Sequence, residues 1–311
     1  MQRQSEPTQL EVGLRDVATG ILTPFGEEDG EIRYDALRSN VQALYDAGVR
    51  TFLACANISE YHSLSHEERI TITEESVDAL AADACVLAGA GGSLKTTTRL
   101  IGAFERTGVD GIMVMPPMHA YKHEQGLLRY YRELAEVADT GIIPYIRGFS
   151  PSVEFLAALT HIDNVAGIKY ALDDIVTFRE AISAGSDDVI WVAVTETLAP
   201  EFYMEGAEGF TAGVSNFRPE IGLALMEALE AGDFERAKEI RDVTLEYQRF
   251  RTECGHDNTF DGAVSIPAVK YGLELAGLTG GAVRPPLVEL SHEDKARAEE
   301  MYHRIEAADV P

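Results

Sequence analysis

Short runs of consecutive apolar residues recur along the chain at nearly regular intervals. Most are continuously apolar rather than alternating, as in Gly111-Ile-Met-Val-Met115, which is typical of strands covered on both faces. Because strands of this kind occur in parallel sheets, the pattern predicts parallel pairing. We expect eight strands, at residues 17–22, 51–55, 85–89, 111–115, 142–146, 165–169, 189–194 and 208–213.

Segments with helical spacing separate these runs. Leu37, Val41 and Leu44 fall on one face of a helix, and Ser65 followed by Glu68 is typical of the capping box that opens a helix. Alternating strands and helices without linkers predict an α/β fold, a (β/α)8 TIM barrel. The alternative is a doubly wound sheet, but no G-x-G-x-x-G dinucleotide motif follows the first strand.

The strand signals end near Asn216, whereas helical signals continue almost to the last residue. We expect helices over about 220–230, 234–252, 264–277 and 292–307. The first of these closes the barrel, and the others form a C-terminal helical extension. The chain therefore divides into a barrel with a short N-terminal extension, residues 1–232, and the C-terminal helical extension, residues 233–311.

The chain of 311 residues is strongly acidic, because 52 Asp and Glu stand against 26 Lys and Arg, a formal net charge of −26. This charge argues against nucleic acid and anionic membranes as partners, since both would repel it. Only six of the basic residues are Lys. An acidic, Lys-poor surface predicts a halophilic protein in a salt-rich cytoplasm, where salt screens the repulsion between carboxylates.

The sequence predicts a cytoplasmic protein. Its N-terminus is polar with no apolar signal region after it, and no apolar run approaches the ~18 residues that a membrane span needs. The three cysteines, Cys55, Cys85 and Cys254, are an odd number, and the first two lie in apolar runs. This usage favours a reducing compartment.

Active sites of such barrels lie at the carboxyl ends of the strands. Lys169 ends the apolar run Val165-Ala-Gly-Ile-Lys169, where desolvation would lower its pKa and leave a neutral amine able to attack a ketone. Tyr145 ends the preceding strand, and a phenol beside an amine can move the protons of imine formation. Together the two residues are candidates for catalysis. The alternative is a lysine paired with Asp173 or Asp174 beside an aromatic residue that fills the barrel.

Several short motifs follow one another in order over about 270 residues. They are Gly20-Ile-Leu-Thr-Pro-Phe25, Ser59-Glu60 with Leu64 and Glu68-Arg69, Pro116-Pro117, Gln125-Gly-Leu127, Tyr145, Gly167-Ile-Lys169, Ser215-Asn216 with Pro219-Glu220, and Val283-Arg-Pro-Pro-Leu287. In order and spacing the whole chain resembles the dihydrodipicolinate synthase / N-acetylneuraminate lyase superfamily of Schiff-base aldolases and dehydratases.

The resemblance implies roles for the matching positions. Lys169 would form the Schiff base and Tyr145 would be the acid and base. Asn57 and Ile58 match the pair that receives the substrate's α-carboxylate; Ile58 has no hydroxyl, although its amide can still donate. The residues expected to bind substrate are Asn57, Ile58, Ser59, Arg147, Thr211 and Ser215.

Three segments most resemble the branch of 5-dehydro-4-deoxyglucarate dehydratases and 2-keto-3-deoxy sugar acid aldolases. They are Glu60-Tyr-His-Ser-Leu64, Leu128-Arg-Tyr-Tyr131 and Tyr145-Ile-Arg147. The branch implies a small keto acid substrate, either cleaved or dehydrated, no cofactor, and a homo-oligomer that is tetrameric in most relatives. Arg147 would then pair with a second carboxylate or a hydroxyl-rich tail; the alternative is a salt-bridged loop arginine.

Two alternatives of other classes stay open. The altered carboxylate motif at Asn57-Ile-Ser59 is compatible with a non-catalytic barrel that binds a keto acid. A metal-dependent lyase is the other alternative, because His62 and His66, and again His119 and His123, are spaced i, i+4. Each of these pairs begins outside a predicted helix, so we expect no metal site.

Overall fold

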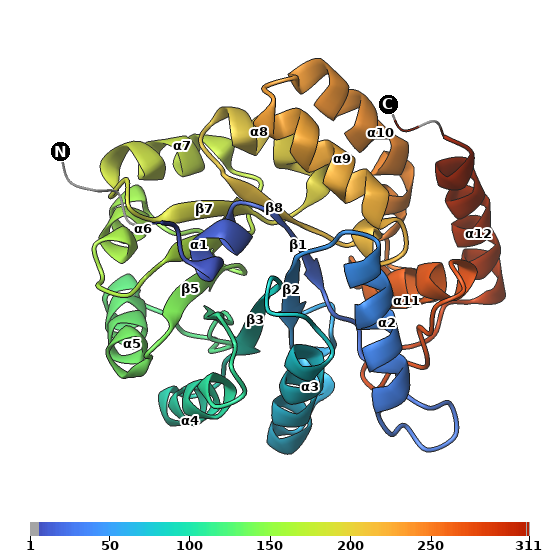
Figure 1. Cartoon of the computed structure of the whole chain (residues 1–311), viewed down its shortest axis with the longest axis horizontal. Coiled ribbons are helices and arrows are strands. Elements are labelled where there is room, and N and C mark those ends of the chain that lie inside the picture. Colours follow the sequence, from blue (N-terminus) through green and yellow to red (C-terminus); the bar gives the residue numbers. More distant parts are fainter. Residues whose placement is uncertain (1–5, 309, 311) are drawn as a thin grey trace.

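The computed structural model describes residues 6–308 and 310, which form a closed barrel of eight parallel strands wrapped by helices (Figure 1). Each strand pairs with the next along the chain, and β8 pairs with β1. The expected (β/α)8 barrel is confirmed, and every expected strand is present to within two residues. The strands are β1 Val17–Gly20, β2 Thr51–Ala54, β3 Cys85–Ala90, β4 Gly111–Val114, β5 Gly141–Ile146, β6 Gly167–Tyr170, β7 Ile190–Ala193 and β8 Gly209–Ala212.

A helix follows each strand and packs on the outside of the barrel. The capping box predicted at Ser65 and Glu68 opens α3, with both reciprocal hydrogen bonds present. None of the helices in the described ranges is long and apolar enough to cross a membrane. The covering helices are α2 Tyr34–Asp46, α3 His66–Asp78, α4 Leu94–Glu105, α5 Glu124–Val137, α6 Val153–Thr160, α7 Ile175–Ala184, α8 Ala199–Met204 and α9 Pro219–Glu230.

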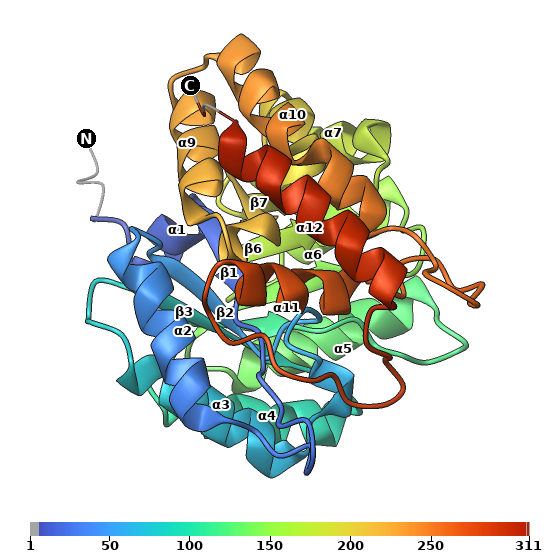
Figure 2. The same ribbon diagram turned by 90° about the vertical axis from the view of Figure 1, so that its right-hand side faces the viewer.

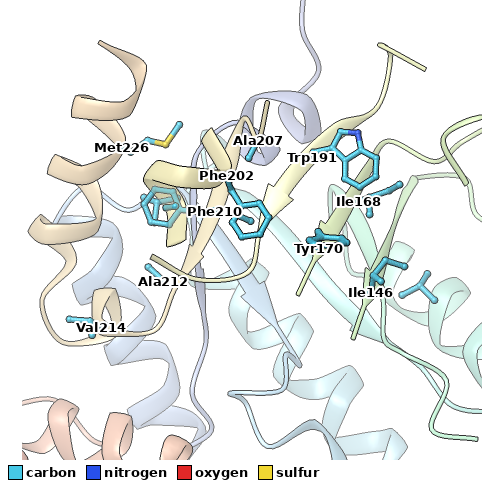
Figure 3. Packing of buried hydrophobic residues seen from close by; sticks show 14 of the residues in the cluster. Ile146, Ile168, Tyr170, Trp191, Phe202, Ala207, Phe210, Ala212, Val214 and Met226 are labelled. Carbon is cyan, nitrogen blue, oxygen red and sulfur yellow. The ribbon is translucent and has the colours of Figure 1, made fainter. Parts of the chain in front are cut away.

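Aromatic rings fill the space between the outer face of β6 and β7 and the helices α7 and α8 (Figure 3). Tyr170, Phe178, Trp191 and Phe202 pack with ring centroids 4.8 to 6.0 Å apart. Because successive side chains of a strand point to opposite faces, anchoring Tyr170 in this outer layer turns Lys169 into the barrel. The packing outside the sheet thus fixes the direction of Lys169 on β6.

A short helix, α1 Gln9–Leu14, closes the amino-terminal end of the barrel. Its Leu10 lies against the first residues of β4 and β5: a Cβ added at Gly111 or Gly141 would come within 2.7 Å of the Leu10 side chain. Glycine at these two positions therefore leaves room for α1. The helix α1 therefore covers the amino-terminal end of the barrel, and its Leu14 lines the small cavity inside.

The C-terminal helical extension is confirmed as three helices, α10 Phe234–Phe250, α11 Ser265–Leu275 and α12 His292–Ala307. They lie together on one flank of the barrel (Figure 2). Phe217, two residues before α9, packs its ring against Tyr247 of α10 and Tyr302 of α12. The apolar core therefore runs across the predicted boundary between residues 232 and 233.

Candidate active site

Lys169 and Tyr145 stand side by side inside the mouth of the barrel. The two residues are register partners on β6 and β5, and they are only 8% and 2% exposed. The Lys169 Nζ lies 4.5 Å from the centre of the Tyr145 ring. Below them is a small cavity of about 20 Å³, which Lys169 lines together with Thr211 and with Leu14 of α1.

The surroundings of this pair shift both of their pKa values downward. Burial is the main cause of the lowered pKa of Lys169, because desolvation disfavours the ammonium. The charge of Arg147 also lowers this pKa, whereas Tyr145 raises it by a smaller amount. Burial alone would raise the pKa of Tyr145, but the positive charges of Lys169 and Arg147 and two hydrogen bonds lower it overall. A lysine with a lowered pKa supplies the neutral amine that attacks carbonyl groups.

The Tyr145 oxygen accepts hydrogen bonds from two directions. Asn57 Nδ2 donates from the turn after β2 at 3.3 Å, and Arg147 Nη1 donates from the loop after β5 at 3.1 Å. Apart from this hydrogen bond, Arg147 is exposed, and it forms no salt bridge within the described part of the chain. The structure thus brings four of the predicted residues together, namely Lys169, Tyr145, Asn57 and Arg147.

The turn after β2 presents two backbone N–H groups without a protein partner. The Ser59 N–H donates to the carbonyl of Ala56, and the Ala56 N–H donates to the Ser59 hydroxyl at 2.9 Å. The buried Thr23 hydroxyl donates to the Ser59 carbonyl at 2.8 Å, which fixes the turn from β1. Among residues 6–308, no acceptor receives the N–H of Asn57 or Ile58. Successive free N–H groups of this kind form an anion-binding concavity.

The Ile58 side chain is turned toward β1. A Cβ added at Gly20 would lie 2.4 Å from Ile58 Cγ2, so the isoleucine packs on the backbone at the end of that strand. Ile58 can therefore offer a ligand its N–H but no side-chain donor. The Ser59 hydroxyl is engaged inside the turn, and the substrate contact expected of it stays a prediction.

Thr211 and Ser215, both predicted to bind substrate, lie in different places. Thr211 of β8 lines the cavity below Lys169, with its hydroxyl donating to the carbonyl of Val194. Ser215 is buried behind the barrel wall, where a Cβ added at Gly222 of α9 would lie 2.1 Å from its Oγ. The Ser215 side chain faces α9 rather than Lys169, so a substrate contact from this residue stays a prediction.

A buried ion pair supports the turn that carries Asn57, and sequence reasoning assigned it no role. Glu60, in left-handed backbone conformation, forms the pair with Lys270 of α11 and also accepts the Arg284 N–H at 3.0 Å. Lys270 and Arg284 both pack on the ring of Phe25, at 4.6 and 4.2 Å from its centre. The signal in the sequence that could have indicated this ion pair is Lys270, a charged residue within the apolar segment that forms α11.

Glu196 is a second supporting residue that the sequence analysis missed. It follows β7, is 4% exposed, and accepts the N–H groups of Gly213 and Val214 at 3.1 and 3.0 Å. The buried carboxylate thereby fixes the loop after β8. The signal in the sequence for this supporting role is the position of Glu196, an acidic residue just after the apolar run that forms β7.

The histidine pairs do not converge on a metal site. His62 is exposed, and the Nδ1 of His119 accepts the N–H of Tyr121 within an exposed loop. His123 caps α5, its Nδ1 accepting the N–H of Gln125 at 3.2 Å. Nowhere in residues 6–308 do three or more His, Cys, Asp or Glu side chains gather closely enough to hold a metal ion.

The model of the dihydrodipicolinate synthetase family matches residues 13–305. The chain belongs to this family. A probable 5-dehydro-4-deoxyglucarate dehydratase of Streptomyces griseus is 31% identical to it over 294 residues, which are 90% of this chain and 89% of that protein. A DapA-like lyase of Halobacterium salinarum is 28% identical, with 93% of both chains covered.

Solved structures of the family have the same architecture. The crystal structure of a dihydrodipicolinate synthase from Oceanobacillus iheyensis superposes with a TM-score of 0.91 at 28% identity, covering 96% of this chain and 99% of that one. This family member is a lyase, as its relatives are. The expected superfamily, and its 5-dehydro-4-deoxyglucarate dehydratase branch, are confirmed.

Proposed function

We propose that this family member is a Schiff-base lyase acting on a 2-keto-3-deoxy sugar acid, with Lys169 as the nucleophile and Tyr145 as the proton carrier. One observation carries the proposal: the buried Lys169, its pKa lowered, stands beside Tyr145 toward the carboxyl ends of β6 and β5. The neutral amine adds to the C2 carbonyl, and loss of water from the carbinolamine leaves an iminium ion that withdraws electrons from C3.

Two reactions can follow from the iminium ion. In dehydration, the C3 proton is removed, the C4–O bond breaks, and the hydroxyl leaves as water after gaining a proton. In aldol cleavage, the C4 hydroxyl loses its proton, the C3–C4 bond breaks, and its electron pair forms the enamine. Tyr145 serves as base and acid in either case, and product analysis distinguishes an aldehyde from a dehydrated acid.

The two ends of the substrate have separate binding groups in this proposal. The free N–H groups of Asn57 and Ile58 receive the α-carboxylate beside the keto group. Arg147, exposed at the mouth and without a carboxylate partner among residues 6–308, faces the far end of the substrate, where it pairs with a second carboxylate or with hydroxyls. Two relatives are named as probable dehydratases of 5-dehydro-4-deoxyglucarate, an acid with a carboxylate at each end. These names favour a second carboxylate, rather than hydroxyls, as the partner of Arg147.

Borohydride trapping tests the proposal. The folded chain is mixed with pyruvate in concentrated KCl, reduced with borohydride, and mapped by intact mass and peptide mass. The expected result is one reduced adduct on Lys169, absent in Lys169→Ala and retained in Lys122→Ala, which removes an exposed lysine from the mouth. Sugar acids of one and two carboxylates are then compared for turnover.

Failure of trapping would change the function assigned to the site. If folded protein gives no adduct with pyruvate or with longer keto acids, Lys169 is not a Schiff-base nucleophile. The chain would then be the non-catalytic keto-acid-binding barrel that the altered motif at Asn57-Ile-Ser59 also permits. Binding of pyruvate without an adduct, measured by calorimetry, would identify that alternative.

We also propose that the chain works as a homo-oligomer, a tetramer by resemblance, in a salt-rich cytoplasm. In support, Met118 and Tyr121 in the loop after β4 are 78% and 86% exposed, and large apolar side chains on loops are common where subunits meet. Light scattering in concentrated KCl is expected to give a mass of four chains. A mass of one chain under those conditions would contradict it.

A further inference from the structure

The hydrogen bonds around the Tyr145 oxygen are all of one kind. Both neighbours, Asn57 Nδ2 and Arg147 Nη1, donate to it. A guanidinium has no acceptor, and the amide of Asn57 presents its nitrogen. In the part of the chain that the structure describes, no group accepts the phenolic proton of Tyr145.

The charges facing Tyr145 act in the same direction. Lys169 comes from β6 and Arg147 from the loop that follows the tyrosine's own strand, and both are cationic when protonated. The inward-facing residues of β4 and β8, Met113 and Thr211, are uncharged, and the Thr211 hydroxyl is already donated to Val194. Lys169 and Arg147 are the charged groups with the largest effect on the pKa of Tyr145. Both of these cations favour the phenolate.

We propose that Asn57 and Arg147 are positioning residues for proton transfer: by donating to the Tyr145 oxygen from two sides they keep it an acceptor, so that Tyr145 enters the reaction as a base. This inference deepens the Schiff-base function proposed above and rests on it for its catalytic meaning. It gives Asn57 and Arg147 a second role in addition to holding the two ends of the substrate.

The proton balance of imine formation closes within this group. A Tyr145 phenolate takes one proton from the Lys169 ammonium, and the neutral amine forms the C–N bond while the carbonyl electron pair moves to oxygen. Tyr145 gives its proton to that oxygen, takes a second proton from the nitrogen, and delivers it as the C–O bond breaks. One water leaves, the iminium nitrogen keeps one proton, and Tyr145 ends as the phenolate with which it began.

The test is a spectrophotometric titration of the intact folded chain without substrate, following phenolate absorbance from pH 6 to 11 in concentrated KCl. The background is favourable, because burial or nearby carboxylates raise the pKa of ten of the other tyrosines. We expect one phenolate to appear below the ordinary value of 10 and Tyr145→Phe to abolish this early step.

Four variants then test the two donors. Asn57→Leu and Arg147→Met each remove one donor and are expected to raise the midpoint of the early step by about 1 pH unit or more. Arg147→Lys keeps the charge and is expected to restore part of the shift. Arg129→Met is the matched control, since it removes an exposed arginine of α5 that pairs with Glu133, and it is expected to leave the midpoint unchanged.

Each outcome supports or overturns the inference. An early step that is absent, that survives Tyr145→Phe, or that moves equally in Arg129→Met overturns it. The titration needs no Schiff base, so its failure is separable from failure of the proposed function. An adduct on Lys169 with no early step retains the lyase and removes the base role of Tyr145, whereas an early step without an adduct retains the acceptor geometry and removes the lyase.

Discussion

The contact between Ile58 and Gly20 shows that the side chain and the backbone of one residue can have different roles. The isoleucine packs its branched end on the glycine at the end of β1, while its N–H has no acceptor among residues 6–308. A hydroxyl at this position is therefore dispensable for holding a carboxylate if the backbone donors suffice. What the contact requires is a residue without a Cβ at position 20.

Gly20→Ala is accordingly expected to lower the free energy of unfolding by about 1–3 kcal/mol, because the new methyl overlaps Ile58 Cγ2 and the β-branched side chain has little freedom to move. The double variant Gly20→Ala with Ile58→Ala is expected to recover much of this loss. Chemical unfolding of the wild type, both single variants and the double variant measures the coupling. Additive losses would show that the two residues do not meet.

A related prediction concerns ligand binding by the same turn. Ile58→Thr keeps the backbone N–H and restores a hydroxyl, which is expected to point at Gly20 as the isoleucine does. The dissociation constant for pyruvate, measured by calorimetry with Lys169→Ala to prevent the covalent step, is expected to change less than about threefold. Tighter binding by tenfold or more would mean that a side-chain donor reaches the carboxylate after all.

At the scale of elements, the segment after α11 ties the C-terminal extension to the barrel. Arg284 donates to both oxygens of Glu68 at the start of α3 and to the carbonyls of Gly30 and Ser63. Together with the Glu60–Lys270 pair, these contacts hold the turn carrying Asn57 between β1 and α11. Two motifs far apart in the sequence thus form one structural unit.

The Arg284–Glu68 pair predicts a pH-dependent contribution to stability. The hydrogen bond from Arg284 lowers the pKa of Glu68 from its ordinary 4.5, so the folded state favours the carboxylate. The stabilisation is therefore full above pH 4.5 and is lost as the pH falls through the lowered value. Glu68→Gln is expected to cost about 1–3 kcal/mol at pH 7 and progressively less below pH 4 in urea unfolding.

The control for this prediction is Glu133→Gln. It removes the partner of Arg129, a surface pair within α5 whose arginine is 80% exposed, and is expected to cost less than about 0.5 kcal/mol at either pH. An equal cost for both variants, or a cost of Glu68→Gln that grows in acid, would contradict the prediction.

The sequence was sufficient to predict the helices and strands and to predict that Lys169 and Tyr145 lie side by side. It was not sufficient to predict the contacts between loops. Continuous apolar runs located the strands, and the ends of neighbouring strands in a parallel barrel necessarily meet. The Asn57–Tyr145 contact depends on the rotation of one turn, and that turn is fixed by Thr23 from the segment after β1. Pairing between Glu60 and Lys270, 210 positions apart, leaves no periodic signal in a sequence.

For the whole molecule, the net charge of −26 makes stability a function of ionic strength. Carboxylates that repel one another in the compact state destabilise it at low salt, and the screening length falls from about 10 Å at 0.1 M to about 3 Å at 1 M. The fold itself is shared with the synthase structure from Oceanobacillus iheyensis at a TM-score of 0.91.

We therefore expect the thermal unfolding midpoint to rise with KCl and to gain most of its increase below about 1 M. A variant with Glu74, Glu136 and Glu180 changed to Gln removes three exposed carboxylates that take part in no ion pair within the described chain. It is expected to unfold at a higher temperature in low salt and to respond less to KCl. An identical salt response in calorimetry would assign the effect to something other than charge repulsion.

The helix α1 that seals the amino-terminal end has a kinetic consequence. Since Leu14 of α1 lines the cavity below Lys169, we expect molecules to reach and leave Lys169 through the mouth of the barrel. The product released from the far end of the substrate must leave the mouth first. The product still bonded to Lys169 can leave only after it. If the reaction is a cleavage, pyruvate is then the last product out, and it will inhibit competitively against the substrate while the first product does not.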